Sequence, residues 1–324
     1  MTRETLERYQ VIAYLAAVLV GGTAGFLWTT AAGSLELLVW PVLAVLLYTT
    51  FCQVSFRDTV QAFRHRRFFT ASLLANFVLV PLIVWALSRL LPPDPAVRLG
   101  VFMILLVPCT DWFVTFTYLG KGSTRLAMAL VPVQLLAQFA LLPVYLWVFM
   151  GQDFVQAVTV GPFLQVFIGI ILAPFILAIL TRYWAGHHST GTGWLRATTW
   201  LPVPLLALVL FLITASQGKA MAQAFASLGW VVLVFALYLI VAVPLARLVA
   251  FVSRIEPDAG RTLAFNVGTR NSFVVLPLAL ALPAGWETAV AVIVLQTFIE
   301  LSGMIFYVWL IPNHIFPSKE HGLC

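Results

Sequence analysis

The stretch Val107-Pro108-Cys109-Thr110-Asp111-Trp112 lies in the middle of an apolar segment that runs roughly from Val97 to Leu119. It places a proline, a thiol and a carboxylate at a depth where a membrane helix offers only hydrocarbon. Pro108 removes one backbone donor, which weakens helical hydrogen bonding at the position where an acid must be accommodated. The stretch therefore predicts a broken helix and a functional site at the same place.

The composition around this stretch is that of a membrane protein. Of 324 residues, 62% are hydrophobic and 9% are charged, whereas an ordinary soluble protein has about 25% charged residues. The mean hydropathy is +1.00. A helix needs about 20 mostly apolar residues to cross a bilayer. We predict an all-α polytopic protein with ten spans, at residues 9–28, 35–55, 68–91, 97–119, 125–149, 160–183, 197–215, 227–252, 261–282 and 288–311.

The basic residues predict the orientation of these spans. The net charge is +6, but the lysines and arginines lie between spans rather than in one patch, which argues against nucleic acid as a partner. One side holds 14 of the 18, namely Arg3, Arg8, Arg57, Arg64, Arg66, Arg67, Lys121, Arg125, Arg182, Arg196, Arg247, Arg254, Arg261 and Lys319. By the positive-inside rule, both termini of this multi-pass protein of the cell (inner) membrane are cytoplasmic.

The chain is expected to consist of two inverted five-helix repeats, residues 1–150 and 151–324. The loop after the fifth span has no basic residue and is therefore outside, so the sixth span enters from the side opposite to the first. Asn266-Val267-Gly268-Thr269-Arg270-Asn271-Ser272 interrupts the ninth span, as the opening stretch interrupts the fourth. Interrupted helices at matching positions of two repeats point to a binding site at the membrane midplane.

Three ionisable residues lie deep in spans: Asp111, Arg270 and Glu300. Each costs about 2.5 to 3.5 kcal/mol at a helix centre and should be paired or line a wet cavity. Asp111 and Arg270 occupy matching positions with opposite charge, so we expect them to approach one another, either as part of the site or as a pair that only neutralises itself. Glu300 shares a helix face with Gln296 and is either a functional acid or an interhelical hydrogen-bonding group.

Cysteine usage excludes two classes of site. Cys52, Cys109 and Cys324 have neither paired nor metal-ligand spacing, so no disulfide framework or zinc site is predicted. We predict no cofactor. Cys109 is open to two interpretations. A lone thiol in a membrane helix behaves as a small hydrophobe, but at a helix interruption a thiol can bind soft ligands.

These motifs together resemble the bile acid:sodium symporter superfamily, and within it the arsenical-resistance permeases that expel arsenite. The likeness extends over all ten predicted spans. Its motifs are Trp40-Pro41, Asn76 with Pro81, Pro108-Cys109-Thr110, Tyr118-Leu119-Gly120-Lys121-Gly122, and Val267-Gly268 with Asn271-Ser272. The resemblance implies that the cysteine is needed for transport and that Glu300 is a membrane acid of the site. It also implies a panel domain of spans 1, 2, 6 and 7 and a core domain of spans 3–5 and 8–10, in which spans four and nine cross.

The chain departs from this pattern at charged positions. Sodium-coupled members carry glutamate in place of Asn266, glutamine in place of Arg270 and often glutamine in place of Asn76. Sodium needs oxygen ligands and negative charge, whereas Arg270 is always cationic. We therefore expect a fixed guanidinium in the space of the coupling ion. Asp111 replaces the small apolar residue that follows Pro-Cys-Thr in arsenite permeases, which leaves the exact substrate open.

We predict a secondary active transporter that exports arsenite or antimonite by alternating access, coupled to protons. Its expected partners are a small-molecule or metalloid oxyanion substrate and the lipid bilayer. The predicted substrate-binding residues are Cys109, which would contact the metalloid, Thr110, Asn271 and Glu300. The residues predicted for ion coupling or charge balance are Asp111, Arg270, Asn266 and Asn76.

Two other classes of function are kept as alternatives. A sodium-independent carrier of a small organic anion would bind its substrate with Arg270 and the N-termini of half-helices. A membrane sensor or an intramembrane enzyme is the third reading. The sequence has no Gly-x-Ser-x-Gly or His-Glu-x-x-His motif and shows no soluble output domain, so we predict no catalytic residues.

Overall fold

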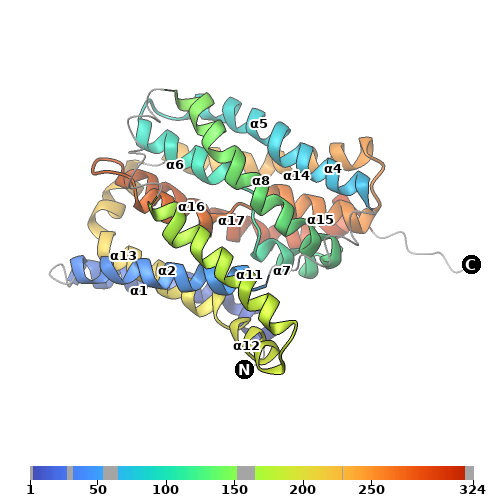
Figure 1. The fold of residues 1–324 in the computed structure, drawn as a ribbon. Helices are drawn as coiled ribbons and strands as arrows, with labels where there is room; N and C mark the ends of the chain where they lie inside the picture. Colours follow the sequence, from blue (N-terminus) through green and yellow to red (C-terminus); the bar gives the residue numbers. More distant parts are fainter. Residues whose placement is uncertain (1–2, 28–31, 54–64, 152–164, 228, 318–324) are drawn as a thin grey trace, which may run out of the picture. The chain divides into compact units, whose positions relative to one another are not determined.

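The computed structural model of the chain describes residues 3–27, 32–53, 65–151, 165–227 and 229–317. In this part of the chain the structure is helical, apart from turns, short extended breaks and one isolated backbone bridge (Figure 1). The predicted all-α class is confirmed. Four residues named above lie outside these ranges: Arg57, Arg64, Lys319 and Cys324.

Five helical segments in the described residues are long and apolar enough to cross a membrane. They are Arg66–Leu90, Thr124–Met150, Phe167–Ala185, Gly229–Val252 and Glu287–Ile315. A sixth is obtained if α12 (Ser189–Thr198) and the following Pro202–Ser216, which bend by 44°, are taken as one span. Other predicted spans contain shorter apolar helices, because they are broken or lie partly outside the described residues. The ten-span arrangement therefore stays a prediction.

The chain divides into two compact units. Unit 1 comprises Met1–Val54, Val155–Gly229 and Phe273–Val294, and unit 2 comprises Ser55–Phe154, Trp230–Ser272 and Leu295–Cys324. Each unit draws segments from both predicted repeats. The site residues named above all belong to unit 2.

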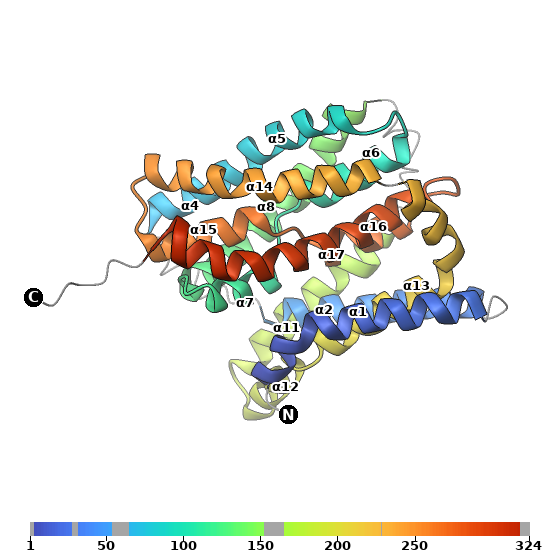
Figure 2. The same cartoon turned by 180° about the vertical axis from the view of Figure 1, so that it is seen from behind.

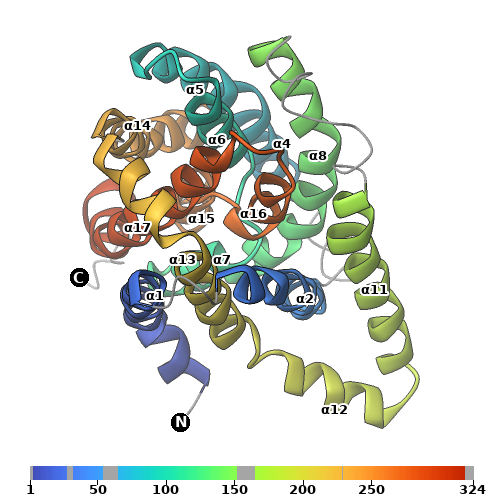
Figure 3. The ribbon, with the colours of Figure 1, turned by 90° about the vertical axis from the view of Figure 1, so that its left-hand side faces the viewer.

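Unit 1 contains the full helices α1 (Arg3–Leu27), α2 (Ala32–Phe51), α11 (Ala173–Ala185), α12 and α13 (Pro202–Ser227). Residues 273–280 of α16 (Ser272–Leu280) also belong to it. Figures 1 and 2 show α13 beside α1, and α13 also packs against α2. Figure 3 shows α11 turning sharply into α12, against which it packs. The hydroxyls of Tyr48 and Thr181, 3.0 Å apart, join α2 to α11.

Two glycines allow α1 and α13 to approach closely. A Cβ at Gly21 would lie 2.2 Å from Thr214 Oγ1 and 2.5 Å from the Phe211 carbonyl oxygen, and one at Gly25 would lie 2.6 Å from the Ala215 carbonyl oxygen. A side chain of any size would push the two helices apart. Gly22, on another face of α1, has nothing within 4 Å of such a Cβ.

Alanine substitutions at these glycines should have opposite effects on stability. We expect Gly21→Ala to destabilise the protein by about 1 to 3 kcal/mol through overpacking. Gly22→Ala should be neutral or stabilising by up to about 1 kcal/mol, because alanine is the better helix former. Thermal unfolding of both variants in detergent measures the difference, and equal midpoints would show that α1 and α13 do not pack in this way.

Unit 2 holds the remaining full helices of the bundle. They include α4 (Arg66–Leu74), the π-helix η2 (Ala75–Leu79), α5 (Val80–Leu87), η3 (Ser88–Leu90), α6 (Pro95–Leu105), α7 (Trp112–Leu119), α8 (Thr124–Met150), α14 (Gly229–Val252), α15 (Pro257–Gly268) and η5 (Ile311–Ile315). Within this unit α15 packs against α4, α7 and α8. Residues 295–310 of α17 (Glu287–Leu310) also belong to unit 2, whereas η4 (Phe167–Leu172) precedes α11 in unit 1.

The two predicted helix breaks are present. The helix α6 starts at a cap formed by Asp94, whose carboxylate accepts from the Ala96 and Val97 amides at 2.8 and 3.2 Å. It ends at Leu105, and α7 begins only at Trp112. Likewise, α15 ends at Gly268 and α16 (Ser272–Leu280) follows after a short extended segment. Pro108 interrupts the helical bonding at the first break, and the polar residues Thr269, Arg270 and Asn271 form the second.

Candidate functional site

The two breaks pair with each other through their backbones. The Cys109 amide donates to the Thr269 carbonyl at 3.2 Å, and the Asn271 amide donates to the Val107 carbonyl at 2.9 Å. These bonds flank an antiparallel bridge in which Pro108 faces Arg270. The facing residues of such a pair do not bond to each other, so Pro108 has no donor to lose. The proline is therefore compatible with the pairing and incompatible with a continuous helix.

The guanidinium of Arg270 is enclosed by oxygen atoms. Arg270 is fully buried, and its Nη2 donates to Asn76 Oδ1 at 2.9 Å, to the Asn266 carbonyl at 3.5 Å and to the Val267 carbonyl. Its Nη1 donates to the Leu105 carbonyl at 3.2 Å. A buried cation requires such partners, because its desolvation is otherwise too costly.

These carbonyls come from helix ends. Leu105 is the last residue of α6, and Val267 lies in the last turn of α15. Carbonyl groups at a helix C-terminus lack an intrahelical partner and carry the negative end of the helix dipole. The breaks therefore create the negative environment that holds the arginine.

Tyr238 of α14 completes the surroundings of this cation. Its ring centroid lies 5.2 Å from the Arg270 guanidinium carbon, within the range of a cation–π interaction. Its hydroxyl donates to the Val267 carbonyl at 2.7 Å. The sequence analysis did not identify Tyr238 as a site residue. A tyrosine inside a buried helix could have indicated it, because a buried tyrosine hydroxyl usually needs a hydrogen-bond partner.

Three amide side chains form a network beside the guanidinium. Asn76 Nδ2 donates to Asn266 Oδ1 at 2.6 Å, while Gln134 Nε2 donates to the same oxygen at 3.0 Å. Asn266 Nδ2 donates in return to Gln134 Oε1 at 2.8 Å. Asn76 lies in η2, and π-helical turns occur frequently at functional sites. The network joins α8 and α15 to η2, whose Asn76 also accepts from the Arg270 guanidinium.

Glu300 bonds to both breaks. Its Oε1 accepts from Trp112 Nε1 at 2.9 Å, and its Oε2 accepts from the Arg270 backbone amide at 2.8 Å and from Gln296 Nε2 at 2.5 Å. The carboxyl group is fully buried. Because Trp112 is the first residue of α7 and Arg270 lies in the second break, this one side chain ties the breaks to α17.

The remaining predicted site residues lie within the two breaks. Cys109 is a free cysteine with only 1% of its surface exposed. The Asn271 Nδ2 donates to Thr110 Oγ1 at 2.8 Å across the paired segments. Asp111 is half-buried and immediately precedes α7. The Cys109 thiol is closed off from solvent in this structure.

The expected direct contact between Asp111 and Arg270 is not formed. Among the described residues, the guanidinium bonds to Asn76 and to backbone carbonyls, and Asp111 is not one of its partners. The antiparallel pairing sets Pro108 opposite Arg270. The guanidinium then reaches back to the C-terminal ends of α6 and α15, whereas Asp111 lies on the other side of the break, at the start of α7.

A helical membrane protein whose two broken helices pair around buried polar and charged residues has the features of a secondary transporter. The model of the Sodium Bile acid symporter family matches residues 40–224, more than half of the chain. The chain belongs to this family, and it is therefore a multi-pass membrane transporter and not an enzyme. Asn76 and Cys109 lie inside the matched range, whereas Asn266, Arg270 and Glu300 lie beyond it.

The chain is also similar to the Arsenical-resistance protein Acr3 of Corynebacterium glutamicum. The two sequences are 26% identical over 132 residues, which is 40% of this chain and 36% of that protein. The similarity thus covers about a third of the relative's length. It supports the resemblance to arsenical-resistance permeases as a distant one.

Removing the Tyr238 hydroxyl should weaken the arginine environment. We expect Tyr238→Phe to lower stability by about 1 kcal/mol, because one buried hydrogen bond is lost while the ring remains. In a protein of this size the thermal midpoint in detergent would fall by about 2 °C. Tyr118→Phe is the matched control, since Tyr118 is 65% exposed, and a similar fall in both variants would contradict the arrangement.

Proposed function

We propose that this protein exports arsenite or antimonite across the cell membrane in exchange for protons, without sodium. Transport proceeds by alternating access, with the paired breaks of α6–α7 and α15–α16 at the binding site. Cys109, Thr110, Asn271 and Glu300 form the substrate site. Arg270, Asn266, Asn76 and Asp111 set its charge balance.

The position of Cys109 carries the proposal. Of the two cysteines in the described part of the chain, it is the one in a helix break, and Cys52 lies at the end of α2. Trivalent arsenic is a soft Lewis acid, and sulfur is the soft ligand among protein side chains. The distant similarity to an arsenical-resistance protein supports the same substrate class.

The bonding of Glu300 supports proton coupling. The indole and backbone N–H groups that reach its carboxylate are donors without acceptor capacity. A proton on the carboxyl group would neutralise it, so the bonds from Trp112 and from the Arg270 amide would lose their charge assistance and weaken. Protonation of Glu300 would therefore alter the attachment of a break to α17, which is the linkage that proton-driven alternating access requires.

The surroundings of Arg270 support sodium independence. Sodium is bound by several oxygen ligands, and the oxygens of Asn76, Leu105 and Val267 are occupied by guanidinium N–H groups. The tethered cation cannot leave, so these oxygens do not serve a transported one. The occupied guanidinium also disfavours the organic-anion alternative, because among its nitrogens only Nε lacks a partner in the described residues.

For topology we propose ten spans in two inverted repeats, residues 1–150 and 151–324, with both termini in the cytoplasm. The distribution of basic residues and the two helix breaks support this arrangement. The family resemblance implies a panel domain of spans 1, 2, 6 and 7 and a core domain of spans 3–5 and 8–10 within this arrangement.

Substitution of the site cysteine should abolish arsenite export. In cells that lack their own exporter, we expect the intact protein to reduce arsenite accumulation by severalfold, equally with sodium replaced by choline. Cys109→Ser should remove this effect, because a hydroxyl is a poor ligand for trivalent arsenic. Cys52→Ser is the matched control and should leave export intact.

The organic-anion alternative predicts the reverse pattern for this experiment. Cys109→Ser would be harmless, Arg270→Gln would not, and the intact protein would leave arsenite accumulation unchanged. A strict requirement for sodium would contradict the proposed coupling instead, even if arsenite is the substrate.

Neutralising Glu300 should uncouple transport from the proton gradient. In everted membrane vesicles we expect arsenite uptake driven by an imposed pH gradient to fall at least tenfold in Glu300→Gln, because the exchangeable proton is lost. Glu287→Gln is the control, since Glu287 is an exposed acid at the start of the same helix. Gradient-driven uptake at the intact rate in Glu300→Gln would exclude Glu300 as the proton carrier.

A further inference from the structure

Two neighbouring hollows in unit 2 share three arginines. The first has a volume of about 540 Å³ and the second about 480 Å³. Arg66, Arg67 and Arg254 line both of them. Neither hollow contains a residue of the transport site.

The first hollow lies where three candidate membrane spans end. Arg66–Leu90 and Thr124–Met150 begin at its edge, and Gly229–Val252 ends two residues before Arg254. One end of each of these three spans lies at the same hollow, so the three ends lie at the same surface of the membrane. Lipid headgroups lie at this level, on the side that the basic residues predict to be cytoplasmic.

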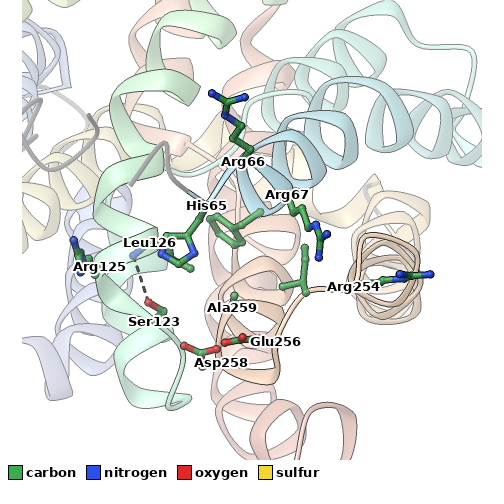
Figure 4. Close-up of a pocket in the computed structure, with 12 residues that line it drawn as sticks. His65, Arg66, Arg67, Ser123, Arg125, Leu126, Arg254, Glu256, Asp258 and Ala259 are labelled. Atoms are coloured by element: carbon green, nitrogen blue, oxygen red, sulfur yellow. Dashed lines mark hydrogen bonds between the residues drawn. The ribbon is translucent and has the colours of Figure 1, made fainter. Parts of the chain in front are cut away.

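The charge of this hollow is mainly positive. Four arginines and His65 line it, against the two acids Glu256 and Asp258. In Figure 4 the two acidic side chains lie together at the lower edge, whereas Arg66, Arg67 and Arg254 lie above and to the right of them. The side chains of these three arginines are exposed and have no hydrogen bond or ion pair with any residue that the structure describes. Such a cluster attracts an anion with several acceptor oxygens.

The backbone of Arg254 gives an independent sign that its side chain is used. The helix α14 ends with the Ile255 amide bonded to the Ala250 carbonyl at 2.9 Å, and Arg254 has a φ of +52°. This is the left-handed position after a helix at which glycine is strongly preferred. An arginine there is conformationally unfavourable, so the helix end alone does not explain it.

The second hollow continues from the arginines along an apolar surface. Thr70, Ala71 and Leu74 of α4 line it together with Val252. Leu74 is 47% exposed and Val252 is 71% exposed. These side chains lie within the candidate spans, so this hollow faces the level of the acyl chains.

We propose that unit 2 binds an anionic phospholipid at these hollows. The phosphate lies among Arg66, Arg67 and Arg254, since planar guanidinium groups bind phosphate oxygens in pairs. An acyl chain follows the second hollow past Leu74. Basic pockets between membrane helices bind acidic headgroups in this manner.

Lipid binding to the purified full-length protein tests the proposal without any transported substrate. Native mass spectrometry from detergent would compare retention of dioleoylphosphatidylglycerol with that of dioleoylphosphatidylcholine. We expect the intact protein to prefer the anionic lipid. The double variant Arg66→Gln, Arg254→Gln should bind it about 25-fold more weakly, at roughly fivefold for each charge removed. The double variant Arg196→Gln, Arg247→Gln loses the same charge away from the hollows and should keep the preference.

The variant Arg254→Gly separates lipid binding from folding. Glycine suits the left-handed backbone, so without lipid we expect a thermal midpoint at or above that of the intact protein. Affinity for phosphatidylglycerol should nevertheless fall. Equal retention of this lipid by the intact protein and the first double variant would overturn the proposal. Its full displacement by millimolar inorganic phosphate would also do so, because the site would then recognise the free anion.

Discussion

The buried positive charge of Arg270 is the constraint on which the structure of unit 2 depends. A fully buried guanidinium must be surrounded by acceptors, and no acidic side chain among the described residues bonds to it. Its partners are the Asn76 amide and carbonyl oxygens from the ends of α6 and α15. A continuous α6–α7 helix would bond the Leu105 carbonyl internally. The helix breaks and the arginine are therefore mutually required.

This requirement explains why the two breaks have the sequences they have. Pro108 cannot donate a hydrogen bond, and the antiparallel bridge places it where no donor is needed. The amides of Cys109 and Asn271 make the flanking bonds. The Arg270 amide, which points away from the bridge, donates to Glu300. These backbone groups, freed by the breaks, hold the breaks to each other and to α17, so a thiol and a carboxylate can occupy the interior of a membrane helix pair.

The sequence predicted the class and the position of the breaks, because proline and clustered polar residues inside apolar runs have few other structural explanations. It could not predict which groups meet there. Asp111 and Arg270 match by position along their spans, but the antiparallel register opposes Pro108 to Arg270 and leaves Asp111 at the far end of the break, next to α7. Tyr238 was missed because its role depends on packing across helices. A single sequence contains spacing along a helix, whereas partner choice is set by register and by contacts between helices.

Glu300 connects this static arrangement to a mechanism. Its carboxylate accepts from Trp112 at the start of α7, from the Arg270 amide in the other break, and from Gln296 on its own helix. The first two donors cannot reverse direction, whereas an amide side chain can turn and present its oxygen. The Gln296 Oε1 is buried and has no partner among the described residues. On the proposed mechanism, a protonated Glu300 therefore has one acceptor available locally, at Gln296. The proton can be held there once the Gln296 amide turns, while the neutral carboxyl holds both breaks to α17 more weakly than the carboxylate does.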